Sequence, residues 1–272
     1  EIAQNMSASE TVSTEIVDEN GDTIIVNKTK PGDFVECNLA SLTLGTIDVK
    51  NQKELEETVR TVVRALDNVI DLNYYPTPYA EVTNKKYRAI GLGTSGYHHM
   101  LVKNDVKWSD REKHGALVDK VYEDINYYAI KESMTIAKEK GSYKEFDGSD
   151  WQNGEYFNLR DYNSDRWQEL AKEVKENGLR NGYLMAIAPT GSTSIISGTS
   201  AGVDPIMSRY FLEEKKGAIV PRVAPGLTTK TFWLYENAHD INQEISMEMA
   251  GVRQRHIDQA QSVNIYLSLI HI

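Results

Sequence analysis

A run of hydroxyl-bearing residues with one glycine is the clearest candidate for ligand binding in this sequence. Thr190-Gly191-Ser192-Thr193-Ser194 follows residues 183–188, an apolar stretch typical of a buried strand, and precedes the apolar pair Ile195-Ile196. Such a turn presents backbone N–H groups and hydroxyls in one concave place, and a helix beginning there would add its positive end. These residue types predict a phosphate cradle that uses no Lys or Arg. A capped helix start without a ligand is the alternative.

A glycine-rich stretch, Gly91-Leu92-Gly93-Thr94-Ser95-Gly96, fits the G-x-G-x-x-G pattern of dinucleotide-binding loops. That kind of site needs an apolar strand just before the glycines and an acidic residue about twenty positions later. Residues 85–90 are too charged for a central strand, and the sequence from Tyr97 onward is typical of a helix. We therefore interpret Gly91, Gly93 and Gly96 as a close-packed turn where two backbones touch, and keep a dinucleotide-binding module as an alternative.

Two other features have simpler interpretations. Cys37 is the only cysteine, which excludes an internal disulfide, and a lone cysteine is more often a small buried apolar residue than a reactive thiol. His98 and His99 are adjacent, so on a helix their side chains point about 100° apart and cannot easily bind one ion. We expect one packed histidine, one solvated histidine and no metal site.

Length, composition and charge limit the class of protein. The 272 residues are 40% hydrophobic and 26% charged, which describes a globular chain with a sizeable core. A net charge of -10 provides no basic field for nucleic acid or an anionic membrane. We find no apolar run of membrane-spanning length and no signal peptide, and therefore expect a cytoplasmic protein. The chain starts at Glu1 instead of Met, which we interpret as a fragment whose beginning is missing.

Hydrophobic periodicity predicts the elements that position these residues. Helices are predicted over residues 52–73, 109–141, 165–177 and 231–248, and buried strands over residues 183–188, 218–223 and 263–267. Ser109 and Glu112 would form a capping box for the second helix, and Gly178 would end the third. Alternating helices and buried strands predict an α/β fold with parallel pairing.

The remaining segments are predicted to be less regular. Residues 1–30 form a surface excursion with a hairpin that turns at Asn20-Gly21. Residues 34–42 are expected near the core because of their apolar content. Residues 142–163 are polar and aromatic without a steady period, and we expect a loop with short turns.

Several of these segments, in this order, resemble the catalytic large subunit of ribonucleotide reductase, most closely the class I ribonucleoside-diphosphate enzymes. The matching segments cover nearly the whole chain: Glu1-Ile2, Cys37-Asn38-Leu39-Ala40-Ser41-Leu42, Arg88-Ala89-Ile90-Gly91-Leu92-Gly93-Thr94-Ser95-Gly96, Ala188-Pro189-Thr190-Gly191-Ser192-Thr193-Ser194 and Gln261-Ser262-Val263-Asn264. The resemblance implies a ten-stranded α/β barrel. Residues 1–272 would be an incomplete catalytic domain from the latter half of that barrel, and the glycines would form a tight turn.

The resemblance also implies roles for single residues. In this family a thiyl radical abstracts hydrogen from C3′ of the ribose, and the radical cysteine would lie just before residue 1. Glu1 matches the glutamate that accepts the 3′-hydroxyl proton, and Cys37 matches one of two redox-active thiols, with its partner cysteine upstream. Thr190, Gly191, Ser192, Thr193 and, with less support, Ser194 match the turn that binds the substrate diphosphate.

The implied activity is reduction of ribonucleoside diphosphates to 2′-deoxyribonucleoside diphosphates for DNA synthesis. The implied partners are the substrate, a metal-containing small subunit that generates the radical, a second copy of the full-length large subunit, and thioredoxin or glutaredoxin. We expect no metal or cofactor bound by residues 1–272, and no nucleic acid or membrane partner. The adenosylcobalamin-dependent class is the alternative, although Glu1-Ile2 and residues 37–41 favour class I. Residues 267–272 do not continue as the family does, and we interpret them as a foreign tail.

Overall fold

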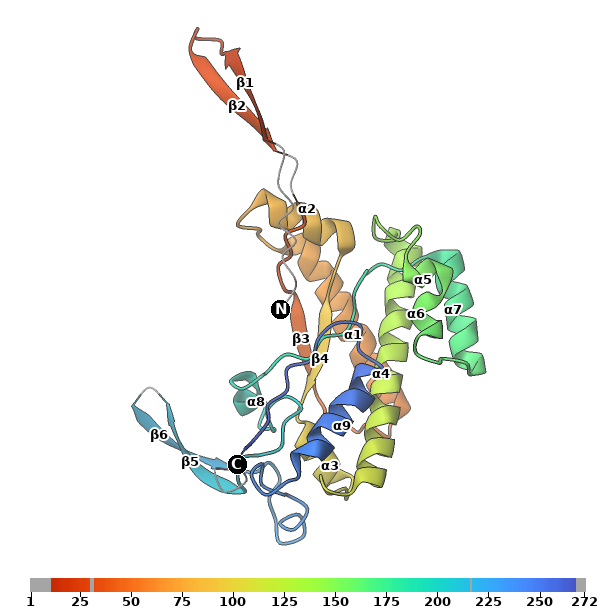
Figure 1. Ribbon diagram of the computed structural model, residues 1–272, viewed down its shortest axis with the longest axis vertical. Helices are drawn as coiled ribbons and strands as arrows, with labels where there is room; N and C mark the ends of the chain where they lie inside the picture. The colour runs from red at the N-terminus through yellow and green to blue at the C-terminus, as the bar shows by residue number, and fades with distance from the viewer. Residues whose placement is uncertain (1–10, 30–31, 216, 268–272) are drawn as a thin grey trace.

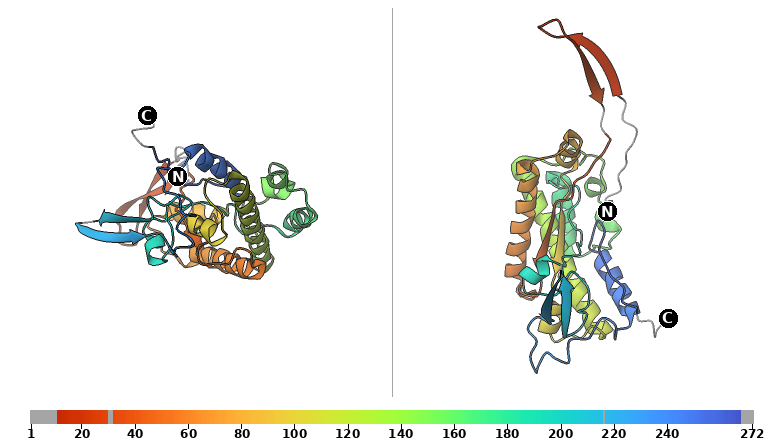
Figure 2. Two further views of the ribbon diagram at one scale, coloured as in Figure 1. Left: turned by 90° about the horizontal axis from the view of Figure 1, so that it is seen from below. Right: turned by 90° about the vertical axis from the view of Figure 1, so that its left-hand side faces the viewer.

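A layer of parallel extended segments, covered on one face by long helices, forms the body of the computed structural model, which describes residues 11–29, 32–215 and 217–267 (Figure 1). Two hairpins extend away from this body, as Figure 1 shows; in Figure 2 one of them stands out in each view. The helices are α1 Gln52–Leu72, α2 Pro78–Tyr87, α3 Tyr97–Lys103, α4 Arg111–Lys140, α5 Asp150–Asn153, α6 Glu155–Asn158, α7 Asp165–Asn177, α8 Thr193–Ile196 and α9 Gln243–Gln254.

The parallel layer is built around strands β3, Leu39–Thr43, and β4, Gly91–Ser95. These strands pair in parallel, with Leu39 opposite Gly91 and Thr43 opposite Ser95. A bridge from Leu92 to Met185 adds the next extended segment on the far side of β4, and a bridge from Ile187 to Gln261 adds another. The predicted α/β fold with parallel pairing is therefore confirmed, although the strands of the described residues form an open layer and do not close into a barrel.

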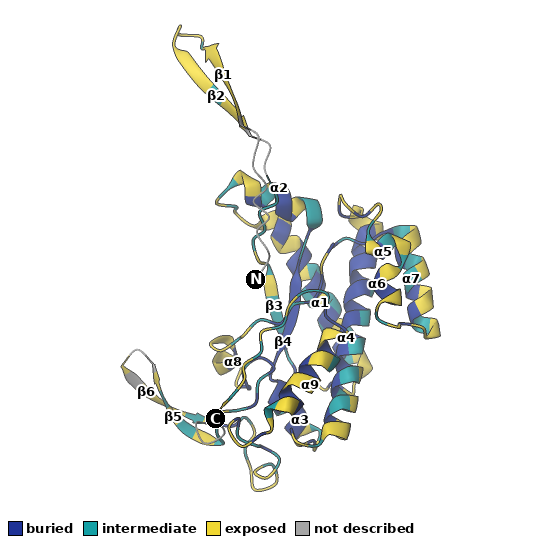
Figure 3. Cartoon of the chain, viewed as in Figure 1, coloured by how far each residue is buried: buried dark blue, intermediate teal, exposed yellow. Residues whose placement is uncertain are grey.

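Helices α1 and α4 cover the layer because each has an apolar face. The predicted helix over residues 52–73 is confirmed: the Asn51 side chain caps α1 by accepting from the Glu54 amide, and Leu55, Val59 and Val63 are fully buried. Buried residues follow β4 and the inward faces of α1 and α4 in Figure 3. The site described below therefore rests on a well-packed support.

Helix α4 ends as predicted but begins differently. Asp110, and not Ser109, caps α4, because the Asp110 carboxylate accepts from the Lys113 amide at 3.2 Å. The Ser109 hydroxyl instead donates to Glu236. Ser109 and Asp110 are both suitable capping residues by type. The Ser109 hydroxyl is bound to Glu236, 127 residues later in the chain, and Asp110 is the cap.

Near the carboxyl end, two predicted elements are wrong and one strand is confirmed with a different pairing. The helix predicted over residues 231–248 lies instead at Gln243–Gln254, because the Asn242 side chain accepts from the Glu244 amide and starts a new helix there. The segment over residues 218–223 is a strand, β6 Ala218–Val223, but it forms an exposed antiparallel hairpin with β5 Tyr210–Lys215 instead of a buried parallel pair. Residues 263–267 form no strand.

The other local predictions are largely confirmed. Strands β1 Thr11–Val17 and β2 Thr23–Thr29 form the predicted hairpin with Gly21 in its turn, and Gly178 ends α7 with a φ of 81°. Residues 142–163 contain only the single-turn helices α5 and α6. Residues 183–188 are extended but pair only through the two bridges, and residues 34–38 are half-buried or exposed.

A buried ion-pair network holds the starts of the central segments together. Arg88 has a φ of 49° and donates from Nε to Asp67 at 2.8 Å and from Nη1 to Asp71 at 2.9 Å. Asn181 donates from Nδ2 to the Arg88 carbonyl oxygen at 2.9 Å. These contacts join α1 to the residues that precede β4 and residues 183–188, and so fix the relative positions of the strands that carry the site.

Candidate functional site

A cavity of about 330 Å³ lies along β3, at the last residue of β4 and beside the turn after residues 183–188. We call it the hydroxyl pocket, because six of its nine lining residues carry a hydroxyl group. None of the nine has an ionisable side chain. They are Leu39, Ala40, Ser41, Thr43, Ser95, Ala188, Thr190, Thr193 and Ser197. The structure thus brings Thr190 and Thr193 of the predicted phosphate turn against residues that our sequence analysis did not assign to a site.

Small residues of β3 and β4 lie beside the hydroxyl pocket. Side chains alternate along a strand, so Ser41 and Thr43 share one face of β3 and are paired with Gly93 and Ser95 of β4. A Cβ on Gly93 would lie 2.4 Å from the Ala186 carbonyl oxygen, so only glycine permits this approach of the two backbones.

The glycine-rich stretch is therefore a strand and not a loop. Our prediction of a tight turn is wrong for Gly91 and Gly93, which lie in β4, although the expected close contact between backbones is present at Gly93. Only Gly96 turns, with a φ of 75°, at the start of α3. A dinucleotide loop needs its glycines between a strand and a helix, so the dinucleotide-binding alternative is wrong.

The predicted phosphate turn is held by hydrogen bonds within itself. Thr193 Oγ1 donates to the Thr190 carbonyl oxygen at 3.3 Å, and Ser194 Oγ donates to the Gly191 carbonyl oxygen at 3.2 Å. Ser194 is fully buried and does not line the pocket, whereas Gly191 and Ser192 are exposed. The following helix, α8, has only four residues, so its dipole adds little and the expected positive helix end is not a strong feature.

Cys37 is exposed, so the expectation of a small buried residue is wrong. The Gly91 amide donates to the Asn38 carbonyl oxygen at 2.8 Å, which continues the pairing of β3 to the residue after Cys37. Cys37 lies two residues before β3 and is not one of the residues that line the hydroxyl pocket. Glu1 lies outside the described residues.

The two histidines differ in burial. His98 is fully buried and its Nδ1 accepts from the Ile206 amide at 3.1 Å; burial lowers its pKa to about 3. His99 is half-buried and its Nδ1 lies 3.1 Å from the Thr199 hydroxyl. The packed histidine is confirmed, but the second is less solvated than expected. In the described part of the chain, no three His, Cys, Asp or Glu residues are grouped to hold a metal ion, and no helix is long and apolar enough to cross a membrane.

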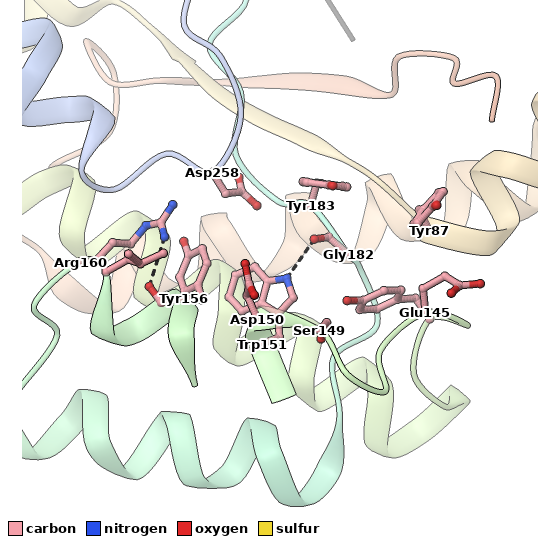
Figure 4. Close-up of a pocket in the computed structure, with 12 residues that line it drawn as sticks. Tyr87, Glu145, Ser149, Asp150, Trp151, Tyr156, Arg160, Gly182, Tyr183 and Asp258 are labelled. Atoms are coloured by element: carbon pink, nitrogen blue, oxygen red, sulfur yellow. Dashed lines mark hydrogen bonds between the residues drawn. The ribbon is translucent and has the colours of Figure 1, made fainter. Parts of the chain in front are cut away.

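A second cavity, of about 390 Å³, lies at the opposite ends of the strands (Figure 4). Its wall is aromatic: Trp151 stacks on Tyr156 with 3.7 Å between ring centroids and donates from Nε1 to the Gly182 carbonyl oxygen at 3.0 Å. Asp258 accepts from the Leu184 and Met185 amides at 2.8 and 2.7 Å. Burial raises the Asp258 pKa to about 6, against the opposing effect of these two hydrogen bonds.

Our sequence analysis missed this second cavity. The aromatic residues within residues 142–163 were visible, but nothing in their spacing showed that they meet Asp258 from more than a hundred residues away. The contacts of Trp151 and Asp258 join α5 and the residues before Gln259 to the extended segment over residues 182–185, and so stabilise the parallel layer.

A parallel layer covered by helices, with a cavity beside its strands, defines an α/β protein. Residues 1–271 match the family described as ribonucleotide reductase, barrel domain. The chain therefore belongs to that family, and the predicted resemblance is confirmed.

Three similar proteins have the names expected for this family. The ribonucleoside-diphosphate reductase subunit alpha of Treponema pallidum is 60% identical over 268 residues, and the subunit of the same name from Helicobacter pylori is 39% identical over 276 residues. The ribonucleoside-diphosphate reductase large subunit of Variola virus is 29% identical over 283 residues. These alignments cover 98%, 96% and 90% of this chain but only 32%, 34% and 37% of the relatives, so the chain spans about a third of their length.

Proposed function

We propose that this chain is the part of a class I ribonucleoside-diphosphate reductase large subunit that holds the substrate diphosphate and supplies one redox thiol. The observation that carries the proposal is the hydroxyl pocket, which Thr190 and Thr193 line together with Ser41, Thr43 and Ser95. The family and the names of the similar proteins support the same activity.

The hydroxyl pocket suits an anion even though it has no cationic side chain. Hydroxyl groups donate hydrogen bonds to phosphate oxygens, and a hydrogen bond to a charged group contributes about 1.5–3 kcal/mol. The Gly191 amide adds a donor, because it makes no hydrogen bond within the described residues. A ring of neutral donors of this kind fits the diphosphate of a nucleotide and explains how a chain of net charge -10 could bind it.

The proposed reaction replaces the 2′-hydroxyl of the ribose by hydrogen. A thiyl radical takes the C3′ hydrogen, Glu1 accepts the 3′-hydroxyl proton, and the 2′-hydroxyl leaves as water. Two thiols, one of them Cys37, supply two electrons and two protons and become a disulfide, and the C3′ hydrogen is returned to the sugar. The net change is one ribonucleotide and two thiols to one deoxyribonucleotide, one disulfide and one water. The exposure of Cys37 supports this role, because thiol exchange needs access.

The partners follow from the same proposal. A metal-containing small subunit would generate the radical, thioredoxin or glutaredoxin would reduce the disulfide, and the full-length large subunit would form a homodimer. The reducing conditions that this thiol chemistry requires are those of the cytoplasm. The interpretation of residues 267–272 as a foreign tail stays a prediction.

A reduction assay tests the proposal. The full-length subunit, supplied with a radical-generating small subunit and a dithiol, is expected to convert ribonucleoside diphosphate to the deoxy form without adenosylcobalamin. The names of the relatives favour this outcome. Turnover that requires adenosylcobalamin and no small subunit would instead establish the cobalamin-dependent class, and the absence of diphosphate reduction under both conditions would refute the proposal.

A further inference from the structure

The hydroxyl pocket contains a serine that neither the sequence analysis nor the family resemblance assigned to a site. Ser95 is the last residue of β4, is only 4% exposed and lines the hydroxyl pocket. Its hydroxyl makes no hydrogen bond to any part of the chain that the structure describes. Ser95 Oγ is not among the fully buried side-chain atoms that lack a partner, so the hydroxyl is open to the cavity and can donate to a ligand or to water there.

The position of Ser95 is fixed by the chain on both sides. Its carbonyl oxygen accepts from the Leu44 amide at 2.9 Å, and Thr43 is its partner across the β3–β4 pair. The next residue, Gly96, donates from its amide to the Ser200 carbonyl oxygen at 2.7 Å. The Ser95 hydroxyl is therefore held on a rigid strand end, whereas Thr190 and Thr193 lie on a turn.

We propose that the Ser95 hydroxyl donates a hydrogen bond to the bound diphosphate from the side opposite Thr190 and Thr193. This inference rests on the proposed function, because it assigns a second wall to the same diphosphate site. Thr43, half-buried beside Ser95, also has a side-chain hydroxyl without a partner among the described residues, and it widens this wall. The bound diphosphate would then have neutral donors on two sides: Thr43 and Ser95 on the strands, and Thr190 and Thr193 on the turn.

Affinity measurements with the full-length subunit test whether the Ser95 hydroxyl itself contacts the diphosphate. Ser95→Ala is expected to weaken ribonucleoside diphosphate binding by about tenfold or more, because a hydrogen bond to a charged group is lost. Its melting temperature should not fall, since no hydrogen bond within the protein is broken. Ser95→Cys keeps the size of the side chain but is a weak donor, and is expected to lose affinity as well.

Ser246→Ala is the matched control. Ser246 is buried on α9, and its hydroxyl oxygen accepts from Trp108 Nε1 at 3.3 Å, so this variant should melt at a lower temperature but bind diphosphate normally. Wild-type affinity in both Ser95 variants would overturn the inference and leave the proposed function intact. Failure of the wild-type subunit to bind the diphosphate would refute the proposed function, and the inference with it.

Discussion

Thr190 and Gly202 are joined by a hydrogen bond that closes the turn of the hydroxyl pocket. The Thr190 hydroxyl oxygen accepts from the Gly202 amide at 2.7 Å, across twelve residues. Thr190 itself has a φ of 37°, which a β-branched residue rarely adopts. Such strain persists only where the surroundings enforce it, and it occurs most often at ligand sites. The contact therefore fixes the shape of the turn before a ligand arrives.

Replacing Thr190 by valine removes the acceptor but keeps the shape of the side chain. The buried Gly202 amide would lose its partner, so we expect Thr190→Val to lower the free energy of unfolding by about 1–3 kcal/mol. Ribonucleoside diphosphate affinity should fall as well. Denaturant unfolding and calorimetry would measure the two effects. Thr190→Ser keeps the oxygen and should stay near wild type; equal loss in both variants would contradict this role.

A leucine at residue 191 tests whether a ligand occupies the turn. A Cβ on Gly191 would meet no atom within 4 Å, so Gly191→Leu should fold normally. A bound diphosphate would compete with the new side chain, and we expect its dissociation constant to rise by about tenfold or more. Gly251→Leu, at an equally open position on α9, is the control and should bind normally. Unchanged affinity in Gly191→Leu would remove the turn from the site.

Asp258 makes stability depend on pH. Its folded pKa of about 6 lies above the ordinary value of 3.8, so between these pH values the folded protein holds more protons than the unfolded chain. The contribution of Asp258 to stability is therefore complete below about pH 4 and is lost as the pH rises through about 6. Melting temperatures across this range would show the slope. Burial lowers the pKa of His98 and His114, so these two histidines contribute a slope of the opposite sign in every variant. The slope should therefore be more positive in Asp258→Asn than in the wild type, whereas Asp240→Asn should match the wild type. Equal slopes in Asp258→Asn and the wild type would refute this assignment.

Replacing the only cysteine separates binding from turnover. Cys37→Ser should bind ribonucleoside diphosphate normally but stop repeated reduction with thioredoxin or glutaredoxin, because serine cannot form the disulfide. The amount of deoxyribonucleotide formed per subunit over time is the measurement. Continued turnover at the wild-type rate would exclude Cys37 from the reaction.

Local patterns predicted the elements whose signals lie within a short stretch of chain. The apolar spacing along residues 52–73 and the cap at Gly178 each specify their own structure, and α1 and α7 follow them closely. The helix predicted over residues 231–248 failed because the side chain of Asn242 starts a new helix inside that window. The choice of Asp110 over Ser109 as cap depended on Glu236, far along the chain.

The candidate site was only half visible in the sequence. The turn at residues 190–194 could be recognised by its residue types, and the structure places Thr190 and Thr193 in the hydroxyl pocket. The part of the pocket formed by Thr43 and Ser95 could not be predicted. These two residues are neighbours only because of the register of β3 and β4, which are distant in sequence. Strand β4 was not predicted, because the residues before Gly91 are charged and the strand begins only at Gly91 itself.

One sugar diphosphate is proposed to lie between the turn at residues 190–194 and strand β3, with its ribose toward Cys37. The most direct test is an experimental structure of the full-length subunit with a bound ribonucleoside diphosphate. We predict that the phosphate oxygens lie within hydrogen-bonding distance of Thr190 and Thr193, with the ribose directed toward the Cys37 side of β3. A diphosphate bound elsewhere, or a ribose directed away from Cys37, would contradict the account.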